Sequence, residues 1–150
     1  MKKRIGIPEI QPEAYRALKG LENYTAQTSI DPLHKELIKI RASQINGCSF
    51  CLNMHVKDAR KKGMPEEKAF LVSAWREAEN AFTEEELLLL QLTEEVTLLH
   101  KQGLTDTTYD KAIALFGEIK TAEIIMCVIT INSWNRMAVA TRLLPVLENK

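Results

Sequence analysis

Residues that start and stop helices constrain the fold of this chain more than any other feature of its sequence. Starts are marked by an N-cap residue with a following proline or glutamate, and ends are marked by glycine. The predicted helices cover residues 12–20, 32–45, 48–62, 65–75, 83–103, 106–117 and 121–144. Alternating β-branched runs with hairpin turns, which would indicate strands, are almost absent. The sequence therefore predicts an all-α fold, a compact bundle of about six to eight helices.

The chain of 150 residues is long enough to bury a core, and we expect residues 1–150 to form a single domain. The last predicted helix is apolar on nearly every side between Ile124 and Ile131. A helix that is apolar all round is buried on all sides, so this one is either the central helix or part of a subunit interface. The apolar run at residues 87–90 adds to this demand for burial. We therefore expect a homo-oligomer.

Charge and hydropathy exclude several classes of function. Twenty basic and twenty acidic residues cancel, whereas a nucleic-acid-binding protein needs a basic excess on one face. The start MKKRIGIPEI lacks the apolar stretch of a signal peptide. The longest apolar run, residues 124–131, is far shorter than the ~20 residues that span a bilayer. We expect no nucleic-acid or membrane partner and a cytoplasmic location, where a close cysteine pair is usually catalytic or metal-binding.

The stretch INGCSFCLNMH, residues 45–55, concentrates the reactive side chains of the sequence. Cys48, Cys51 and His55 fall within one stripe of a helix that turns by about 100° per residue. Cysteines at this spacing can form a reversible disulfide, and the helix N-terminus after Gly47 stabilises a thiolate. His55 can take a thiol proton or stabilise the thiolate as imidazolium. Proximity to the helix start favours Cys48 as the more acidic thiol, whereas the neighbouring histidine favours Cys51.

Glu36 lies at the edge of the apolar stripe of the preceding helix. A carboxylate on a partly apolar face is expected to have a raised pKa, which would let it shuttle protons near neutral pH. A zinc site is the main alternative, in which the two cysteines and His55 take Glu36 or His34 as the fourth ligand.

These residues together resemble a known signature. Glu36, eleven residues, Cys48-Ser-Phe-Cys51, three residues and His55 are similar in type and spacing to the alkylhydroperoxidase D-like (AhpD-like) branch of the carboxymuconolactone decarboxylase family. The INGC core with a following Gly63 is typical of that branch, and INSWNRMAVATR at residues 131–142 resembles the corresponding family helix. The resemblance implies an all-α fold that assembles as a trimer or hexamer.

The resemblance also implies an activity and a role for each residue. It implies a thiol-dependent peroxidase in which Cys51 attacks the hydroperoxide, Cys48 resolves the product as a disulfide, and Glu36 and His55 relay protons. No bound cofactor is implied, but an external dithiol reductant of lipoyl or thioredoxin type is. The best-known members carry a histidine directly before the second cysteine, where this chain has Phe50. The decarboxylase branch lacks the cysteine pair, so decarboxylation is disfavoured.

Two other functions stay open at this point. One is a disulfide oxidoreductase that acts without a peroxide step. The other is a non-catalytic helical oligomer whose CxxC senses redox state or binds zinc. The leading hypothesis is an enzyme that reduces hydroperoxides through a reversible Cys48–Cys51 disulfide.

Overall fold

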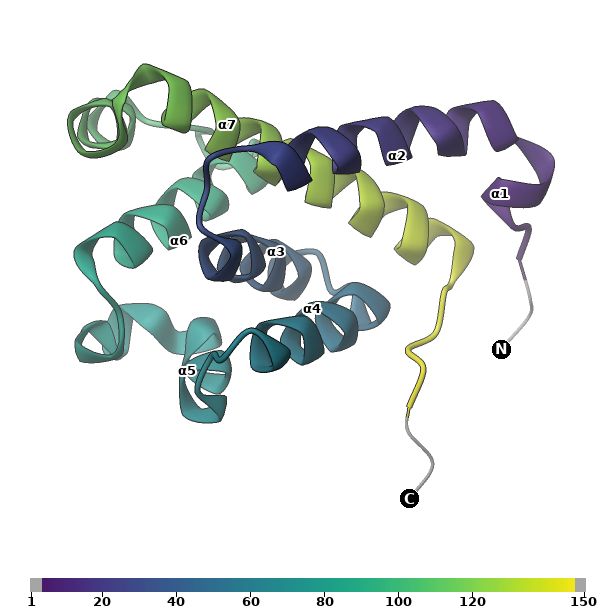
Figure 1. Ribbon diagram of the computed structural model, residues 1–150, viewed down its shortest axis with the longest axis horizontal. Helices are drawn as coiled ribbons and strands as arrows, with labels where there is room; N and C mark the ends of the chain where they lie inside the picture. Colours follow the sequence, from purple (N-terminus) through teal and green to yellow (C-terminus); the bar gives the residue numbers. More distant parts are fainter. Residues whose placement is uncertain (1–3, 148–150) are drawn as a thin grey trace.

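A single long helix, α7, lies along one side of the computed structural model, which describes residues 4–147 (Figure 1). The elements are α1 (Ile7–Ile10), α2 (Pro12–Gln27), α3 (Pro32–Ile45), α4 (Ser49–Lys61), α5 (Glu66–Leu71), α6 (Glu84–Thr97) and α7 (Asp106–Thr141), with 3₁₀ turns at Val72–Glu77 and Glu79–Ala81. None of the described residues forms a strand. The predicted all-α class and the predicted number of helices are confirmed.

Several predicted boundaries are wrong, and each error has a local cause. Helix α2 continues past Gly20 because a glycine on an exposed helix face costs only about 1 kcal/mol relative to alanine. Helix α6 ends at Thr97 instead of Gly103, and the chain then returns so that Glu95 accepts hydrogen bonds from the backbone N–H and hydroxyl of Thr105. Thr105, not Asp106, is the N-cap of α7.

The two predicted C-terminal helices form one helix with a kink. Gly117 adopts φ 76°, a left-handed conformation that glycine tolerates, and the helix resumes directly after it. The hydroxyl of Thr121 donates to the carbonyl of Ala112 over 3.1 Å and ties the two halves together across the kink. The helix ends at Thr141, and Arg142 follows in the left-handed region.

Helix α3 lies between two apolar clusters that together make the core. On one side, Ile38 and Ala42 pack in the cluster that holds Ile124 and Val128 of α7, together with leucines of α6. On the other side, Leu37 packs in the cluster built around α5 and the following 3₁₀ turns. Helix α3, not the apolar α7, is therefore the central helix, and α7 packs its apolar stretch against one side of it. The central place of α3 means that a charged side chain on it becomes buried.

The capping residues at the start of α6 form the hydrogen bonds that the sequence predicts. The hydroxyl of Thr83 accepts a hydrogen bond from the backbone N–H of Glu86, whose carboxylate accepts one from the backbone N–H of Thr83 over 2.7 Å. This is the reciprocal capping box that the sequence predicts at the start of α6.

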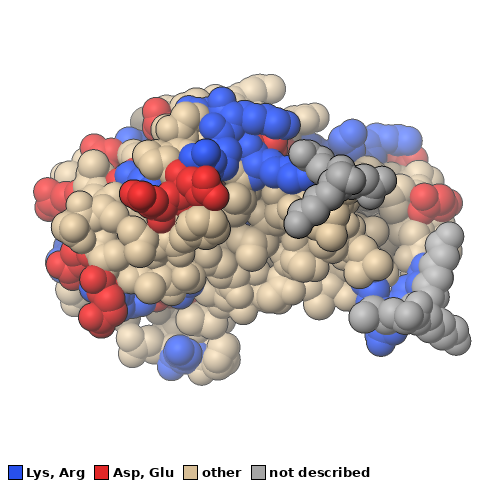
Figure 2. Space-filling view, turned by 90° about the horizontal axis from the view of Figure 1, so that it is seen from below, with Lys and Arg blue, Asp and Glu red and all other residues tan. Residues whose placement is uncertain are grey.

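The surface carries both signs of charge. Figure 2 shows lysine and arginine side chains in groups beside acidic ones, with a broad area free of charged residues across the middle of that face. Within residues 4–147, no helix combines the length and apolarity needed to cross a bilayer.

Candidate active site

The turn at Gly47 folds α4 back against α3 and so creates the site. Gly47 adopts φ 64°, and the backbone N–H of Cys48 donates to the carbonyl of Ser43 over 3.0 Å. A left-handed glycine with this backward hydrogen bond is the Schellman ending of a helix. The glycine break in the sequence thus predicted a tight helical hairpin, and side chains from both helices meet along its inner face.

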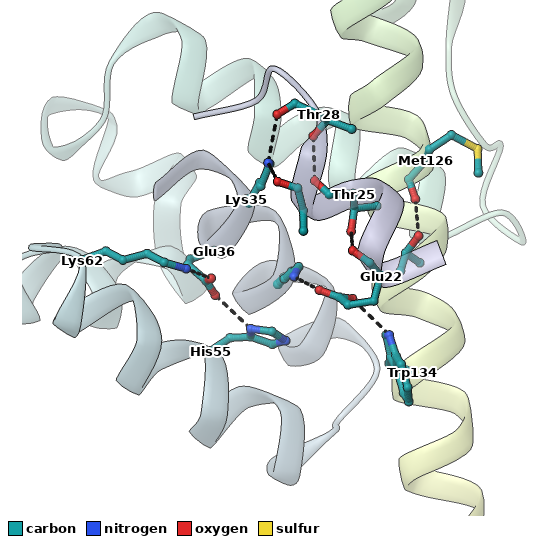
Figure 3. Close-up of polar contacts among 12 residues, drawn as sticks. Glu22, Thr25, Thr28, Lys35, Glu36, His55, Lys62, Met126 and Trp134 are labelled. Carbon is teal, nitrogen blue, oxygen red and sulfur yellow. Dashed lines mark hydrogen bonds and ion pairs between the residues drawn. The ribbon is translucent and has the colours of Figure 1, made fainter. Parts of the chain in front are cut away.

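Glu36 of α3 is held by His55 of α4 and by Lys62, the C-cap residue of that helix (Figure 3). Nδ1 of His55 lies 2.9 Å from Oε2 of Glu36, and Nζ of Lys62 donates to Oε1. The side chains of Glu36 and His55 are 5% and 8% exposed, so this is a buried acid–base pair with one cation at its rim. The pairing of Glu36 with His55 joins two residues of the predicted site. Lys62 was missed, although it follows His55 by two helical turns and therefore shares its face.

The expected direction of the Glu36 pKa is wrong. Burial alone raises the pKa of this carboxyl, but the hydrogen bonds and positive charges of His55 and Lys62 outweigh burial and hold the pKa below its ordinary value. Glu36 is therefore a carboxylate, which can only accept hydrogen bonds. Nδ1 of His55 must then donate to it, and Nε2 is the ring nitrogen left for other partners.

Cys48 is the N-cap of α4 and not a member of a helical stripe, because its backbone is extended. The backbone N–H of Cys51 donates to Sγ of Cys48 over 3.3 Å. The side-chain hydrogen bond from Cys51 is the main cause that lowers the pKa of Cys48 to about 6, with further help from backbone N–H groups and from Asn135. The same interaction raises the pKa of Cys51. The resting pair thus carries one negative charge on Cys48 and one proton on Cys51.

The two sulfurs face different openings. Cys51 lines a cavity of about 820 Å³ together with Glu36 and His55, and Phe50 forms part of its wall. Cys48 lines a separate pocket of about 180 Å³ beside Arg142. Both cysteines are only 2% exposed as residues.

A second buried polar group lines the large cavity opposite the Glu36 pair. Nζ of Lys39 donates to Oε1 of Glu22 over 2.5 Å, and Nε1 of Trp134 donates to Oε2 of Glu22 over 3.1 Å. Trp134 lies in the stretch that resembles the family helix, whereas sequence reasoning missed the other two residues. Their partners lie on three different helices, and no spacing along the chain predicts such a meeting. Asn135, in the same stretch as Trp134, is fully buried beside the cysteines.

The arrangement offers one set of side chains with metal-ligand spacing among residues 4–147. The ligand atoms of Glu36, His55 and Asp58 lie within 4.8 Å of one another. The set excludes both cysteines, and Lys62 already neutralises its carboxylate. His34, the predicted fourth zinc ligand, lies with Nδ1 3.9 Å from Glu85. The donors of the predicted zinc site are therefore not gathered at one point.

Comparison with known proteins bears on the whole chain. The sequence profile described as the carboxymuconolactone decarboxylase family matches residues 12–95. The chain belongs to the carboxymuconolactone decarboxylase family. An uncharacterized relative, YdfG of Bacillus subtilis (strain 168), is 38% identical over 140 residues, which are 93% of this chain and 95% of the relative.

Solved structures confirm the AhpD-like fold expected of this family. A protein of unknown function from Agrobacterium tumefaciens, whose descriptive name suggests AhpD-type antioxidant defence, matches with a TM-score of 0.93 and 38% identity over 98% of this chain and 100% of its own. An uncharacterized peroxidase-related protein from Silicibacter sp. TM1040 matches with a TM-score of 0.79 and 19% identity over 91% of this chain and 72% of its own. The second likeness concerns the fold alone.

Proposed function

We propose that this protein is a thiol-dependent peroxidase that reduces organic hydroperoxides through a Cys48–Cys51 disulfide. The observation that carries the proposal is that Cys51, His55 and Glu36 line one cavity while the Cys48 sulfur accepts a hydrogen bond from the Cys51 backbone. A substrate in this cavity meets Cys51, a base and a buried carboxylate, and the second sulfur stands directly behind.

The first step uses His55 as the base. Nε2 of His55 takes the Cys51 proton, and Glu36 stabilises the imidazolium that forms. The Cys51 thiolate attacks the terminal peroxide oxygen, the O–O bond breaks, and the alkoxide leaves with the electron pair. Sulfur is oxidised to sulfenic acid, and the alkoxide becomes an alcohol when it takes up the equivalent of the proton released from Cys51.

The second step uses the charge already present on Cys48. Its thiolate attacks Sγ of the Cys51 sulfenic acid, and hydroxide leaves and takes a proton from solvent to become water. The resulting disulfide is reduced by an external dithiol of lipoyl or thioredoxin type, which returns both cysteines to the reduced state. The depressed pKa of Cys48 supports the role of resolving nucleophile, because that thiolate exists at neutral pH.

Thiol counting tests the proposal. The chain has three cysteines, and Cys127 is fully buried in the core with a pKa raised to about 11, chiefly by burial. One equivalent of tert-butyl hydroperoxide should therefore lower the titratable thiols of the unfolded, acid-quenched protein from three to one, and dithiothreitol should restore three. Cys127→Ser is the matched control and should lose two thiols in the same way. Three thiols that persist after peroxide would refute the activity.

The runner-up is thiol–disulfide exchange without a peroxide step. The thiolate of Cys48 in its own pocket favours this second candidate, because such a sulfur can attack a disulfide directly. A protein that exchanges with lipoamide disulfide but keeps its thiols in the presence of hydroperoxide has this activity instead.

A further inference from the structure

Lys39 is a buried cation that the steps above do not use. The residue is 7% exposed, it lies one helical turn after Glu36 on α3, and it lines the cavity that Cys51 lines. Residues three apart on a helix are neighbours. Lys39 and the His55–Glu36 pair therefore flank the same part of the cavity.

Lys39 is held in place by Glu22, which is itself held by Trp134. Glu22 accepts one N–H of the ammonium through Oε1, and its other oxygen is held by Nε1 of Trp134 (Figure 3). Burial alone lowers the pKa of Lys39, but the hydrogen bond and charge of Glu22 outweigh it, so the pKa is raised and the group stays protonated. An ammonium has three N–H donors, and Glu22 is the acceptor that the described residues provide. The remaining donors are available to a molecule in the cavity.

A gain in folding stability does not by itself explain why Lys39 and Glu22 form a buried ion pair. Buried ion pairs contribute little net stability because desolvation offsets their attraction, and apolar side chains of similar volume join helices equally well. In a water-poor cavity, by contrast, a fixed cation acts strongly on a charge that develops during reaction. The proposed peroxidase step develops such a charge on the leaving oxygen.

We propose that Lys39 is a catalytic residue that stabilises and protonates the alkoxide released when Cys51 attacks the hydroperoxide. This role rests on the proposed function. As the bond from Cys51 Sγ to the terminal oxygen forms and the O–O bond breaks, the inner oxygen gains the electron pair and takes a proton from Nζ of Lys39. The neutral amine then regains a proton from the His55 imidazolium or from solvent. The net change is thiol and hydroperoxide to sulfenic acid and alcohol. His55 thus serves the sulfur and Lys39 serves the leaving group.

Leaving-group dependence tests this division of labour. tert-Butyl hydroperoxide releases a strongly basic alkoxide that needs a proton, whereas peracetic acid releases a carboxylate that needs none. Lys39→Met should slow single-turnover oxidation by tert-butyl hydroperoxide by about a hundredfold, the usual contribution of a general acid, and oxidation by peracetic acid by less than about threefold. Lys19→Met removes a charge from the exposed rim of the same cavity and should slow neither reaction.

A second variant guards against misfolding. Lys39→Met leaves the Glu22 carboxylate without its cation. The double variant Lys39→Met with Glu22→Gln removes both charges. The rate of the double variant must depend on the leaving group in the same way as that of Lys39→Met. Equal losses with both peroxides in the two variants assign Lys39 a structural role and overturn the proposal, as does an unchanged rate with tert-butyl hydroperoxide. Failure of the wild type to react with either peroxide refutes the peroxidase itself and this role with it. A wild type that reacts while the variants show no selectivity refutes only the role of Lys39.

Discussion

The backbone N–H of Cys51 donates to Sγ of Cys48 over 3.3 Å, so the second cysteine of the CxxC helps to set the charge of the first. Because Cys48 is the N-cap residue of α4, its sulfur takes the place that a serine or aspartate oxygen fills in other helices. The sulfur is therefore stabilised as an anion before any substrate arrives.

The first prediction concerns this anion. Titration of the reduced protein, followed by the ultraviolet absorbance of thiolates, should show one thiolate per chain appearing with a pKa near 6. Cys48→Ser should abolish this step, because the sulfur that ionises is gone and burial still raises the pKa of the remaining Cys51 thiol. Cys127→Ser should leave the step unchanged. A step near pH 6 that persists in Cys48→Ser would assign the anion to another residue.

The same ionisation should make stability depend on pH. A pKa lowered on folding adds no stability below pH 6 and adds stability between about pH 6 and pH 9, at up to about 1.4 kcal/mol per pH unit. Above pH 9 the raised pKa of Cys51 acts in the opposite direction, because the unfolded thiol ionises and the folded one does not. Urea unfolding under reducing conditions should therefore give a maximum near pH 9 that Cys48→Ala flattens. A wild-type profile that already lacks the rise would contradict the lowered pKa.

The third prediction concerns the sulfur that meets peroxide. With dimedone present, tert-butyl hydroperoxide should label Cys51 in the Cys48→Ser variant, because Cys51 lines the cavity with His55. Cys51→Ser should give no label, as judged by peptide mass spectrometry. A sulfenate trapped at Cys48 in the Cys51→Ser variant would reverse the two roles.

Lys62 should determine the pH below which the rate of oxidation falls. It helps to hold the pKa of Glu36 below its ordinary value, so Lys62→Met should raise that pKa and move the loss of activity at low pH toward neutrality. The sign follows because the reaction needs Glu36 as a carboxylate, which is lost as pH falls through its pKa. Lys61→Met, one residue away with its nearest acid 3.9 Å distant, is the control. The rate of single-turnover oxidation is measured as a function of pH. The same loss of rate at low pH in the wild type and in Lys62→Met would exclude this role.

A buried ion cluster away from the site should dominate stability. The carboxylate of Glu94 accepts from Trp75 over 2.8 Å and pairs with Arg41 and Arg76 at 2.6 and 2.5 Å. Glu94→Leu leaves a part-buried arginine and an indole N–H without their acceptor, so unfolding in urea should lose about 3–5 kcal/mol. Glu13→Gln breaks an exposed pair with Arg16 and should change stability by less than about 0.5 kcal/mol. Comparable losses in the two variants would contradict the importance of burial.

The expected homo-oligomer rests on exposed apolar side chains. Ile119 is 79% exposed and Leu115 is 40% exposed, and they lie one turn apart on α7. We predict that light scattering gives a mass of several chains and that Ile119→Glu lowers it. Glu118→Gln, at the next position, should leave the mass unchanged. A wild-type mass of one chain would refute the prediction.

The sequence predicted those parts of the fold that depend on nearby residues. The capping box at Thr83 and the left-handed turn at Gly47 are determined locally, so both were predicted correctly. Gly20 carries the same signal but lies inside α2, because a glycine on an exposed helix face costs only about 1 kcal/mol, whereas Gly117 does interrupt α7 with a left-handed kink.

The candidate site also has parts that nearby residues predict and parts that they do not. Cys51 and His55 share a helix, and the family resemblance, not the spacing, implied that Glu36 belongs with them. The group of Glu22, Lys39 and Trp134 depends on a contact between residues 112 positions apart, and no local pattern predicts it. The direction of the Glu36 pKa was wrong for a related reason, since the sequence revealed the burial but not the cation that Lys62 provides.

The hairpin at Gly47 also has a consequence for how the molecule is made. Glu36 finds His55 only 19 positions away and Lys62 only 26 positions away, so closing these loops costs little chain entropy. Contacts of short sequence separation form early in folding. The thiols and their acid–base partners therefore belong to a segment of low contact order, whereas the wall formed by α2 and α7 must wait for distant parts of the chain. A nascent chain acquires its reactive centre before it acquires the enclosure that selects what reaches it.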